Sequence, residues 1–271
     1  MSIFDQKVIK YEMKPLSSLE KVFPDETPVY RMECQMLSGL WGETVSFQVA
    51  YTGDFVMRER LDVRVVSELA EHVHVRTVEM VPVGRATNGI VDDNYLKTIS
   101  GLYPDLLKDL KDGKVIVYSR QWRSLWVDVD ITNEIPAGEY EIELQLIKEG
   151  EVVCSAKQKV TVIGTELPKL DIMHTEWMHA DCLADYYHVE VFSEEHWKLL
   201  ENYFQEYVKR DCNMMLTPLF TSPLDTAIGL ERTTCQLIDV EVKDGEYVFG
   251  FENLKRWIDL CKKCGIEYFE M

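Results

Sequence analysis

Four side chains that suit a sugar site lie close together in one segment: Glu176, Trp177, His179 and Asp181. A tryptophan ring stacks on the apolar face of a pyranose, while carboxylate and imidazole groups hydrogen-bond to its hydroxyls. Asp225 lies in a second polar loop, 217–226, and is a further candidate. The alternative is that Trp177 packs under a loop and the polar groups only satisfy backbone atoms.

Metal chemistry is a weaker reading of the same region. The spacing of His174, His179, Asp181 and His188 fits no zinc signature, and no HExxH motif occurs. His72 and His74 read as the solvent side of a strand whose other face carries Val73 and Val75. The lone CxxC of Cys261 and Cys264 has no second pair, which favours two cysteines on a half-buried helix face. We therefore expect no metal and no other cofactor.

The elements around the cluster predict alternating strands and helices. A short strand at Leu170 and Ile172 precedes the cluster, and an amphipathic helix capped by Ser193 follows it. The sequence then predicts a strand at 213–220, a hairpin turning at Asp244-Gly245, a helix over 252–264 and a last strand from Ile266. Polar residues at strand ends are typical of the C-terminal rim of a (β/α) barrel. We expect residues 170–271 to form the first units of such a barrel.

Residues 1–165 read instead as a separate all-β domain. Short strands with period-2 alternation, such as 43–51, are separated by closely spaced turn residues. This pattern predicts an antiparallel β-sandwich. Residues 86–113 interrupt it with a loop and one short helix, Tyr103 to Leu110. The Pro-containing segment 165–169 is the expected linker.

Composition narrows the function classes. The net charge of −18 argues against nucleic acid and anionic membrane surfaces as partners. No signal peptide is evident, and no apolar run approaches the ~18–20 residues of a spanning helix. Seven scattered cysteines fit a reducing compartment, so we expect a cytoplasmic protein.

Six sequence segments along the chain resemble glycoside hydrolase family 123. Three lie in the second half, WMHADCLADYYHVEVFSEEHW, NMMLTPLFTSPLDTAIGLER and FENLKRWIDLCKKCGIEYFE, and resemble the opening of that family's catalytic barrel. GETVSFQVA, QWRSLWVDVDI and PAGEYEIEL resemble the β-sandwich that precedes it. The resemblance implies hydrolysis of β-linked N-acetylgalactosamine-type sugars by substrate-assisted catalysis. In that mechanism an adjacent Asp-Glu pair on a later barrel strand orients the acetamido group and acts as general acid and base.

The adjacent pair is missing from the part of the sequence where the resemblance places it. Asp25-Glu26 is the only Asp-Glu neighbour, and it lies in the sandwich region, so we assign no catalytic residue. The barrel portion has about 100 residues, whereas eight units need roughly 200 or more. Our first hypothesis is therefore an inactive, truncated glycoside hydrolase-like protein whose incomplete barrel favours self-association. Carbohydrate is the partner that the resemblance implies. The alternative is a non-enzymatic glycan- or protein-binding module.

Overall fold

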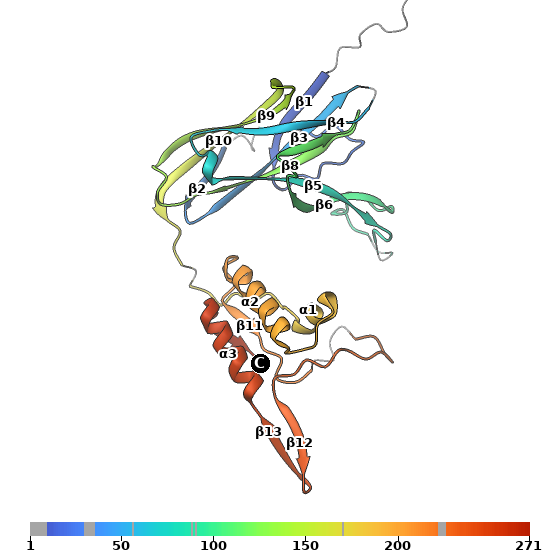
Figure 1. Ribbon diagram of the computed structural model, residues 1–271, viewed down its shortest axis with the longest axis vertical. Coiled ribbons are helices and arrows are strands. Elements are labelled where there is room, and N and C mark those ends of the chain that lie inside the picture. The colour runs from blue at the N-terminus through green and yellow to red at the C-terminus, as the bar shows by residue number, and fades with distance from the viewer. Residues whose placement is uncertain are drawn as a thin grey trace, which may run out of the picture. The chain divides into compact units, whose positions relative to one another are not determined.

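The computed structural model describes residues 10–29, 36–55, 57–87, 89, 91–169, 171–221 and 226–271. The chain divides into two compact units, Met1–Pro168 and Lys169–Met271, and each is described here by itself (Figure 1).

Two five-stranded sheets form the first unit. The first sheet has the order β1-β3-β8-β5-β6, with β1 at Lys10–Ser17, β3 at Thr44–Asp54, β8 at Arg123–Asp130, β5 at Val73–Val83 and β6 at Gly101–Asp109. The second has the order β2-β10-β9-β4-β7, with β2 at Met36–Trp41, β10 at Glu151–Glu166, β9 at Gly138–Lys148, β4 at Glu59–Val66 and β7 at Lys114–Val117. Neighbouring strands are antiparallel except β2 and β10, which are parallel. A 3-10 turn, Ala70–His72, precedes β5.

Alternation along the strands produces one core between these sheets. Phe47, Val49 and Tyr51 on β3 are buried, and Leu125 and Val127 on the neighbouring β8 are buried beside them. Leu144 and Leu146 on β9 meet them from the other sheet as members of the same cluster. The expected mostly antiparallel β structure of the first unit is confirmed.

The predicted helix from Tyr103 to Leu110 is wrong. Residues 101–109 form β6, which pairs antiparallel with β5. The register shifts where Glu79 faces Leu106 and Met80 faces Pro104, so Asp105 is an extra residue in a bulge. Because β6 is an edge strand, Pro104 costs no interior ladder bond. The apolar spacing of the leucines resembles one helix face, but pairing with β5 decides the structure.

Helices and short strands alternate in the second unit. The helices are α1 at Ala180–Tyr187, α2 at Glu194–Val208 and α3 at Glu252–Cys264, and the strands are β11 at Met214–Leu216, β12 at Asp239–Lys243, β13 at Glu246–Gly250 and β14 at Tyr268–Glu270. β11 and β14 pair in parallel, and β12 and β13 form a hairpin. Ser193 caps α2, and Gly265 ends α3 with a φ of 106°, as the sequence predicts.

The expected strand at Leu170 and Ile172 is not formed at Ile172, and Leu170 lies outside the described residues. The segment nevertheless lies beside the start of β11. Asn213 holds it there, since its side chain accepts from the His174 amide at 2.8 Å and donates to the Ile172 carbonyl at 2.8 Å. These two side-chain hydrogen bonds supplement the backbone bonds from the Asn213 and Met214 amides to the His174 carbonyl.

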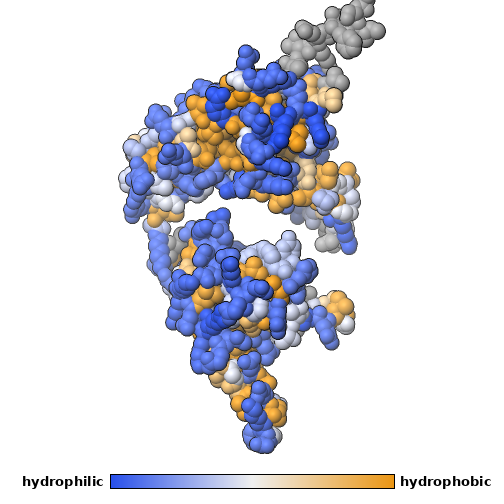
Figure 2. All heavy atoms as spheres, in the orientation of Figure 1, coloured by the Kyte–Doolittle hydropathy of each residue, from blue (hydrophilic) through white to orange (hydrophobic). Residues whose placement is uncertain are grey.

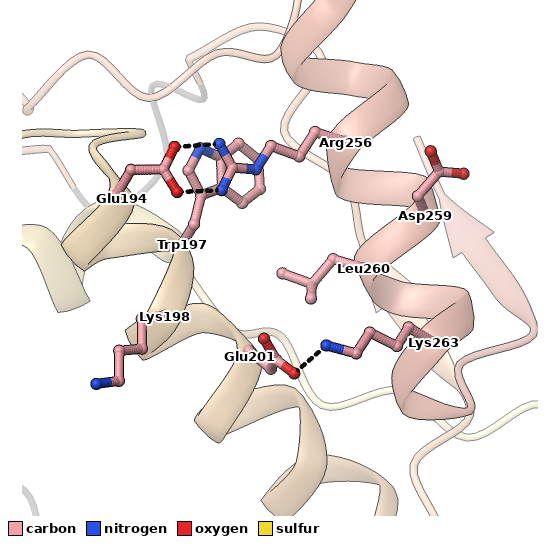
Figure 3. A pocket seen from close by; sticks show the side chains of 8 residues that line it. All are labelled: Glu194, Trp197, Lys198, Glu201, Arg256, Asp259, Leu260 and Lys263. Carbon is pink, nitrogen blue, oxygen red and sulfur yellow. Dashed lines mark hydrogen bonds and ion pairs between the residues drawn. The ribbon is translucent and has the colours of Figure 1, made fainter.

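Helices α2 and α3 pack along a seam that combines apolar and ionic contacts. Phe204 and Trp257 are fully buried, with ring centroids 5.0 Å apart in an edge-to-face arrangement. Figure 3 shows the outer part of the seam, where Arg256 forms a two-pronged ion pair with Glu194 at 2.6 and 2.7 Å. The Arg256 guanidinium also lies 4.7 Å from the Trp197 ring centroid. The groove at this seam is therefore a helix-packing feature whose charges already neutralise one another.

The β12–β13 hairpin exposes apolar side chains (Figure 2). Val240 pairs with Phe249 and Val242 with Tyr247, so all four share one face. Each is at least 40% exposed. None of the described helices is both long and apolar enough to cross a membrane.

Candidate functional site

A cleft of about 370 Å³ opens at the carboxyl ends of β11 and β14. Leu216 and Glu270 are opposite each other at the ends of the two strands, and the chain continues from Leu216 into one wall of the cleft. The segment 177–181 forms another wall. Because parallel strands end at the same edge, segments distant in sequence meet here. The volume is within the range of small-molecule sites.

Trp177 is the aromatic wall of this cleft. The residue is 57% exposed, and its Nε1 donates to Glu270 Oε2 at 3.0 Å. The hydrogen bond links the segment 177–181 to the end of β14 and restricts rotation of the indole. An exposed, oriented indole suits stacking on a sugar ring.

The backbone before Trp177 is held by Tyr207 of α2. The Tyr207 hydroxyl accepts from the Glu176 amide at 2.7 Å and donates toward the Met214 carbonyl at 2.7 Å. Burial raises the pKa of this phenol, so it stays protonated and keeps its donor. One hydroxyl thus ties the segment that carries Trp177 to the start of β11.

Asp181 and Arg232 form a buried ion pair at the side of the cleft. The Arg232 Nε donates to Asp181 Oδ2 at 2.6 Å and its Nη2 to Oδ1 at 2.9 Å. Both side chains are nearly inaccessible, at 9% and 13% exposure. Asp181 also lies in the first turn of α1, where the helix dipole favours a negative charge. The pair is therefore a rigid polar feature rather than a free acid.

Behind the cleft, His196 fixes the beginning of α1. This fully buried residue accepts at Nδ1 from the Phe192 amide at 2.9 Å, so Nε2 carries the proton and donates to the Ala180 carbonyl at 3.0 Å. Burial lowers the pKa of His196, and the hydrogen bond to the Ala180 carbonyl and the nearby Asp181 charge oppose this only in part. The imidazole is consequently neutral at pH 7 and has a structural role.

The polar loop after β11 forms the wall of the cleft that continues from Leu216. Thr221 lines the cleft and accepts at Oγ1 from the Cys235 amide at 3.1 Å. Burial raises the pKa of the Cys235 thiol to about 12, so it is not a nucleophile at pH 7. Asp225, the candidate expected in this loop, lies outside the described residues.

The structure brings together three of the candidates expected from the sequence: Trp177, His179 and Asp181 all line the cleft. Glu176 does not. Its carboxylate is exposed, lies 3.6 Å from His174 Nε2 and is not part of the cleft lining. Arg232 was missed because its only sequence signal is a charge in a loop, which does not reveal a buried partner.

No group of three His, Cys, Asp or Glu side chains suited to a metal occurs within the described ranges. The residues that line the cleft can stack on a ligand through an aromatic ring and can form hydrogen bonds through imidazole, guanidinium and threonine hydroxyl groups. Asp25 and Glu26 are exposed in the loop after β1, where Glu26 pairs with Lys97. The adjacent acidic pair is therefore a loop feature of the first unit.

The chain is similar to a family of catalytic domains over most of its second unit. Residues 177–271 match the family model "Glycoside hydrolase 123, catalytic domain". A family 123 glycoside hydrolase from Clostridium perfringens, studied for glycolipid glycan hydrolysis, superposes with a TM-score of 0.69 at 14% identity. The alignment covers 95% of this chain and 46% of that one, so the chain spans about half of its relative. The resemblance to family 123 is confirmed.

Other similarities are weaker. A β-glucosidase from Listeria innocua aligns with a TM-score of 0.27 at 10% identity, over 59% of this chain and 17% of that one. The N-terminal domain of PorA also gives 0.27, at 11% identity, over 54% of this chain and 99% of that domain. Both scores are too low to indicate a shared fold. No curated protein matches the sequence.

Proposed function

We propose that this chain is a glycan-binding, glycoside hydrolase-like protein whose sugar site is the cleft at the ends of β11 and β14. The observation that carries the proposal is the exposed Trp177 ring, oriented by Glu270 at the rim of a cleft that lies within the family 123 match. In this proposal β11, α3 and β14 belong to a partial (β/α) barrel of the TIM type. His179 and the Asp181–Arg232 pair hydrogen-bond to sugar hydroxyls.

The proposed ligand is a β-linked N-acetylgalactosamine-type glycan, the substrate class that the family resemblance implies. The relative's action on glycolipid glycans supports the same choice. We further propose that these 271 residues bind such a glycan without turning it over. Substrate-assisted catalysis needs an acidic pair at the acetamido group, and Asp25-Glu26 lies in a loop of the first unit. A cytoplasmic location stays a prediction from the cysteine content.

Calorimetric titration with N-acetylgalactosamine-terminated oligosaccharides tests the proposal. We expect saturable binding that Trp177→Ala abolishes, because the variant removes the stacking surface. Tyr186→Ala is the matched control, since Tyr186 is an exposed aromatic residue of the same unit that does not line the cleft. Absence of binding would contradict the sugar site. Enzyme-like cleavage of a nitrophenyl β-N-acetylgalactosaminide would contradict the absence of turnover.

A protein-binding module is the second candidate function, and the β12–β13 hairpin favours it. Its apolar face is formed by Val240, Val242, Tyr247 and Phe249, all exposed, and a lone hairpin is only marginally stable in water. Covering this face, by a second copy or by another protein, would stabilise the hairpin. Sedimentation at increasing concentration tests self-association. The candidate predicts a mass increase that Val242→Lys suppresses, and a monomer at all concentrations argues against a second copy as the partner.

A further inference from the structure

A second cavity, of about 780 Å³, lies within the first unit between the edge strand β7 and strands β5 and β6. Tyr51 and Arg123 face each other directly across β3 and β8 and both line it. Because opposite residues of an antiparallel pair share a face, Arg123 points to the same inner side as the buried Tyr51. The Arg123 guanidinium therefore belongs to the lining of this cavity between the two sheets.

The lining of this cavity is unusually basic for an acidic chain. It contains six cations, Arg58, Arg60, Lys108, Lys111, Lys114 and Arg123, against three carboxylates, Glu59, Glu79 and Asp109, whereas the whole chain has a net charge of −18. Arg60 is neutralised by Asp112 at 2.9 Å and Lys114 by Asp62 at 3.3 Å.

Two of the three carboxylates have cation partners of their own. Glu59 pairs with Lys148 at 2.9 Å, and Asp109 lies 3.7 Å from Arg76. Within the part of the chain that the structure describes, no ion pair neutralises the remaining four cations, Arg58, Lys108, Lys111 and Arg123. The cavity therefore carries a net positive charge.

Arg123 is held in place but not fully hydrogen-bonded. Its guanidinium lies 5.1 Å from the Tyr118 ring centroid, and Nη2 donates to Gln121 Oε1 at 3.0 Å. Its Nη1 is buried and has no hydrogen-bond partner among the described residues. A buried donor without an acceptor costs free energy, which an incoming oxyanion would recover by a small rotation of the guanidinium.

Groups that suit hydroxyls lie beside these cations. The Tyr51 hydroxyl has only a long contact, 3.4 Å, with the Ile116 carbonyl, and burial raises the pKa of this phenol, so it remains a donor. The Glu79 carboxylate is exposed and accepts from Thr77 with one oxygen. The Glu79 carboxylate repels a bare anion but accepts hydrogen bonds from hydroxyls. The lining therefore favours a ligand that carries both an anionic group and hydroxyl groups.

We propose that this cavity of the first unit binds a small anionic saccharide, with the carboxylate or sulfate group near Arg123, Lys108 and Lys111 and the hydroxyls near Tyr51 and Glu79. The volume suits such a ligand. The site is separate from the cleft of the second unit, so it does not rest on the sugar site proposed there.

Titration of the full chain tests the proposal. The Trp177→Ala background is used so that the cleft contributes no binding. The probes are glucuronate, galactose 6-sulfate, neutral galactose and sodium sulfate. We expect saturable binding of one or both acidic sugars, at least about tenfold tighter than galactose or inorganic sulfate, the worth of one charge-assisted hydrogen bond. Equal binding of inorganic sulfate, or no binding of either acidic sugar, would overturn the proposal.

Variants locate the binding. Lys108→Gln combined with Lys111→Gln removes two exposed charges and should preserve folding, because neither side chain is in the core. We expect it to weaken binding about tenfold and to reduce its dependence on salt. Arg123→Gln should weaken binding at least as much. Arg210→Gln is the matched charge control, because Arg210 is an exposed arginine that follows α2 in the second unit. Unchanged affinity in both Lys108→Gln/Lys111→Gln and Arg123→Gln would contradict this location.

Discussion

Trp177 Nε1 donates to Glu270 Oε2 at 3.0 Å, although the two residues are 93 positions apart in the sequence. This bond joins the end of β14 to the cleft wall that carries the indole. Asp181 and Arg232 make a comparable link 51 positions apart. Both bonds connect the 177–181 segment to later parts of the same unit. The cleft is therefore shaped by side chains that are far apart in the sequence.

Glu270 is expected to act as a positioning residue for Trp177. Glu270→Leu removes the acceptor and should weaken binding of an N-acetylgalactosamine-terminated glycan by roughly three- to tenfold, less than Trp177→Ala, because the ring remains but is free to rotate. Glu270→Gln keeps an acceptor oxygen and should bind nearly as the parent does. Calorimetry of the three variants checks this order. Equal losses in Glu270→Leu and Glu270→Gln would show that the charge, not the hydrogen bond, matters.

The Asp181–Arg232 pair should be sensitive to removal of one partner. Arg232→Met leaves a buried carboxylate without its cation and should cost about 3–5 kcal/mol of unfolding free energy. Urea unfolding followed by helix circular dichroism measures this in the second unit, where the described α-helices lie. Asp181→Leu combined with Arg232→Met removes both charges and should cost less than the two single losses together. Additive losses would show that the two groups do not interact.

Local signals explain which parts of the second unit could be predicted. Ser193 with acidic residues in the first turn, Asp244-Gly245 between alternating strands and Gly265 after an amphipathic stretch each determine structure within a few residues. The helix α1 was missed, although the spacing of Ala180, Leu183 and Ala184 is a helical signal.

Signals that depend on distant partners were missed or misread. The edge strand β6 looked helical because its leucines are spaced like one helix face, and only β5 reveals the bulge at Asp105. Of the cleft, the sequence predicted Trp177, His179 and Asp181 from their residue types. It could not predict Arg232 or Glu270, because both reach the site through tertiary pairing.

Thiol reactivity should separate the cysteines of the second unit. Cys182 is exposed, whereas Cys235 and Cys261 are buried, and burial raises the pKa of Cys235 to about 12. Iodoacetamide at pH 8 should label Cys182 first and leave Cys235 and Cys261 unmodified in the folded protein, since the thiolate is the reactive form. Peptide mass mapping identifies the sites, and labelling in urea is the control that all three are reactive when exposed. Early labelling of Cys235 would contradict its burial.

His196 should make the second unit less stable in mild acid. Its pKa is lowered from the ordinary 6.5 by burial, so between the folded and unfolded pKa values the unfolded chain binds more protons. The stabilisation is complete above pH 6.5 and is lost as the pH falls toward the folded pKa. Urea unfolding by helix circular dichroism from pH 7.5 to 5 should show this decline. His196→Gln has no titrating ring and keeps one donor and one acceptor, so it should show a shallower decline than the parent. An identical pH slope in both proteins would assign the acid sensitivity to other groups.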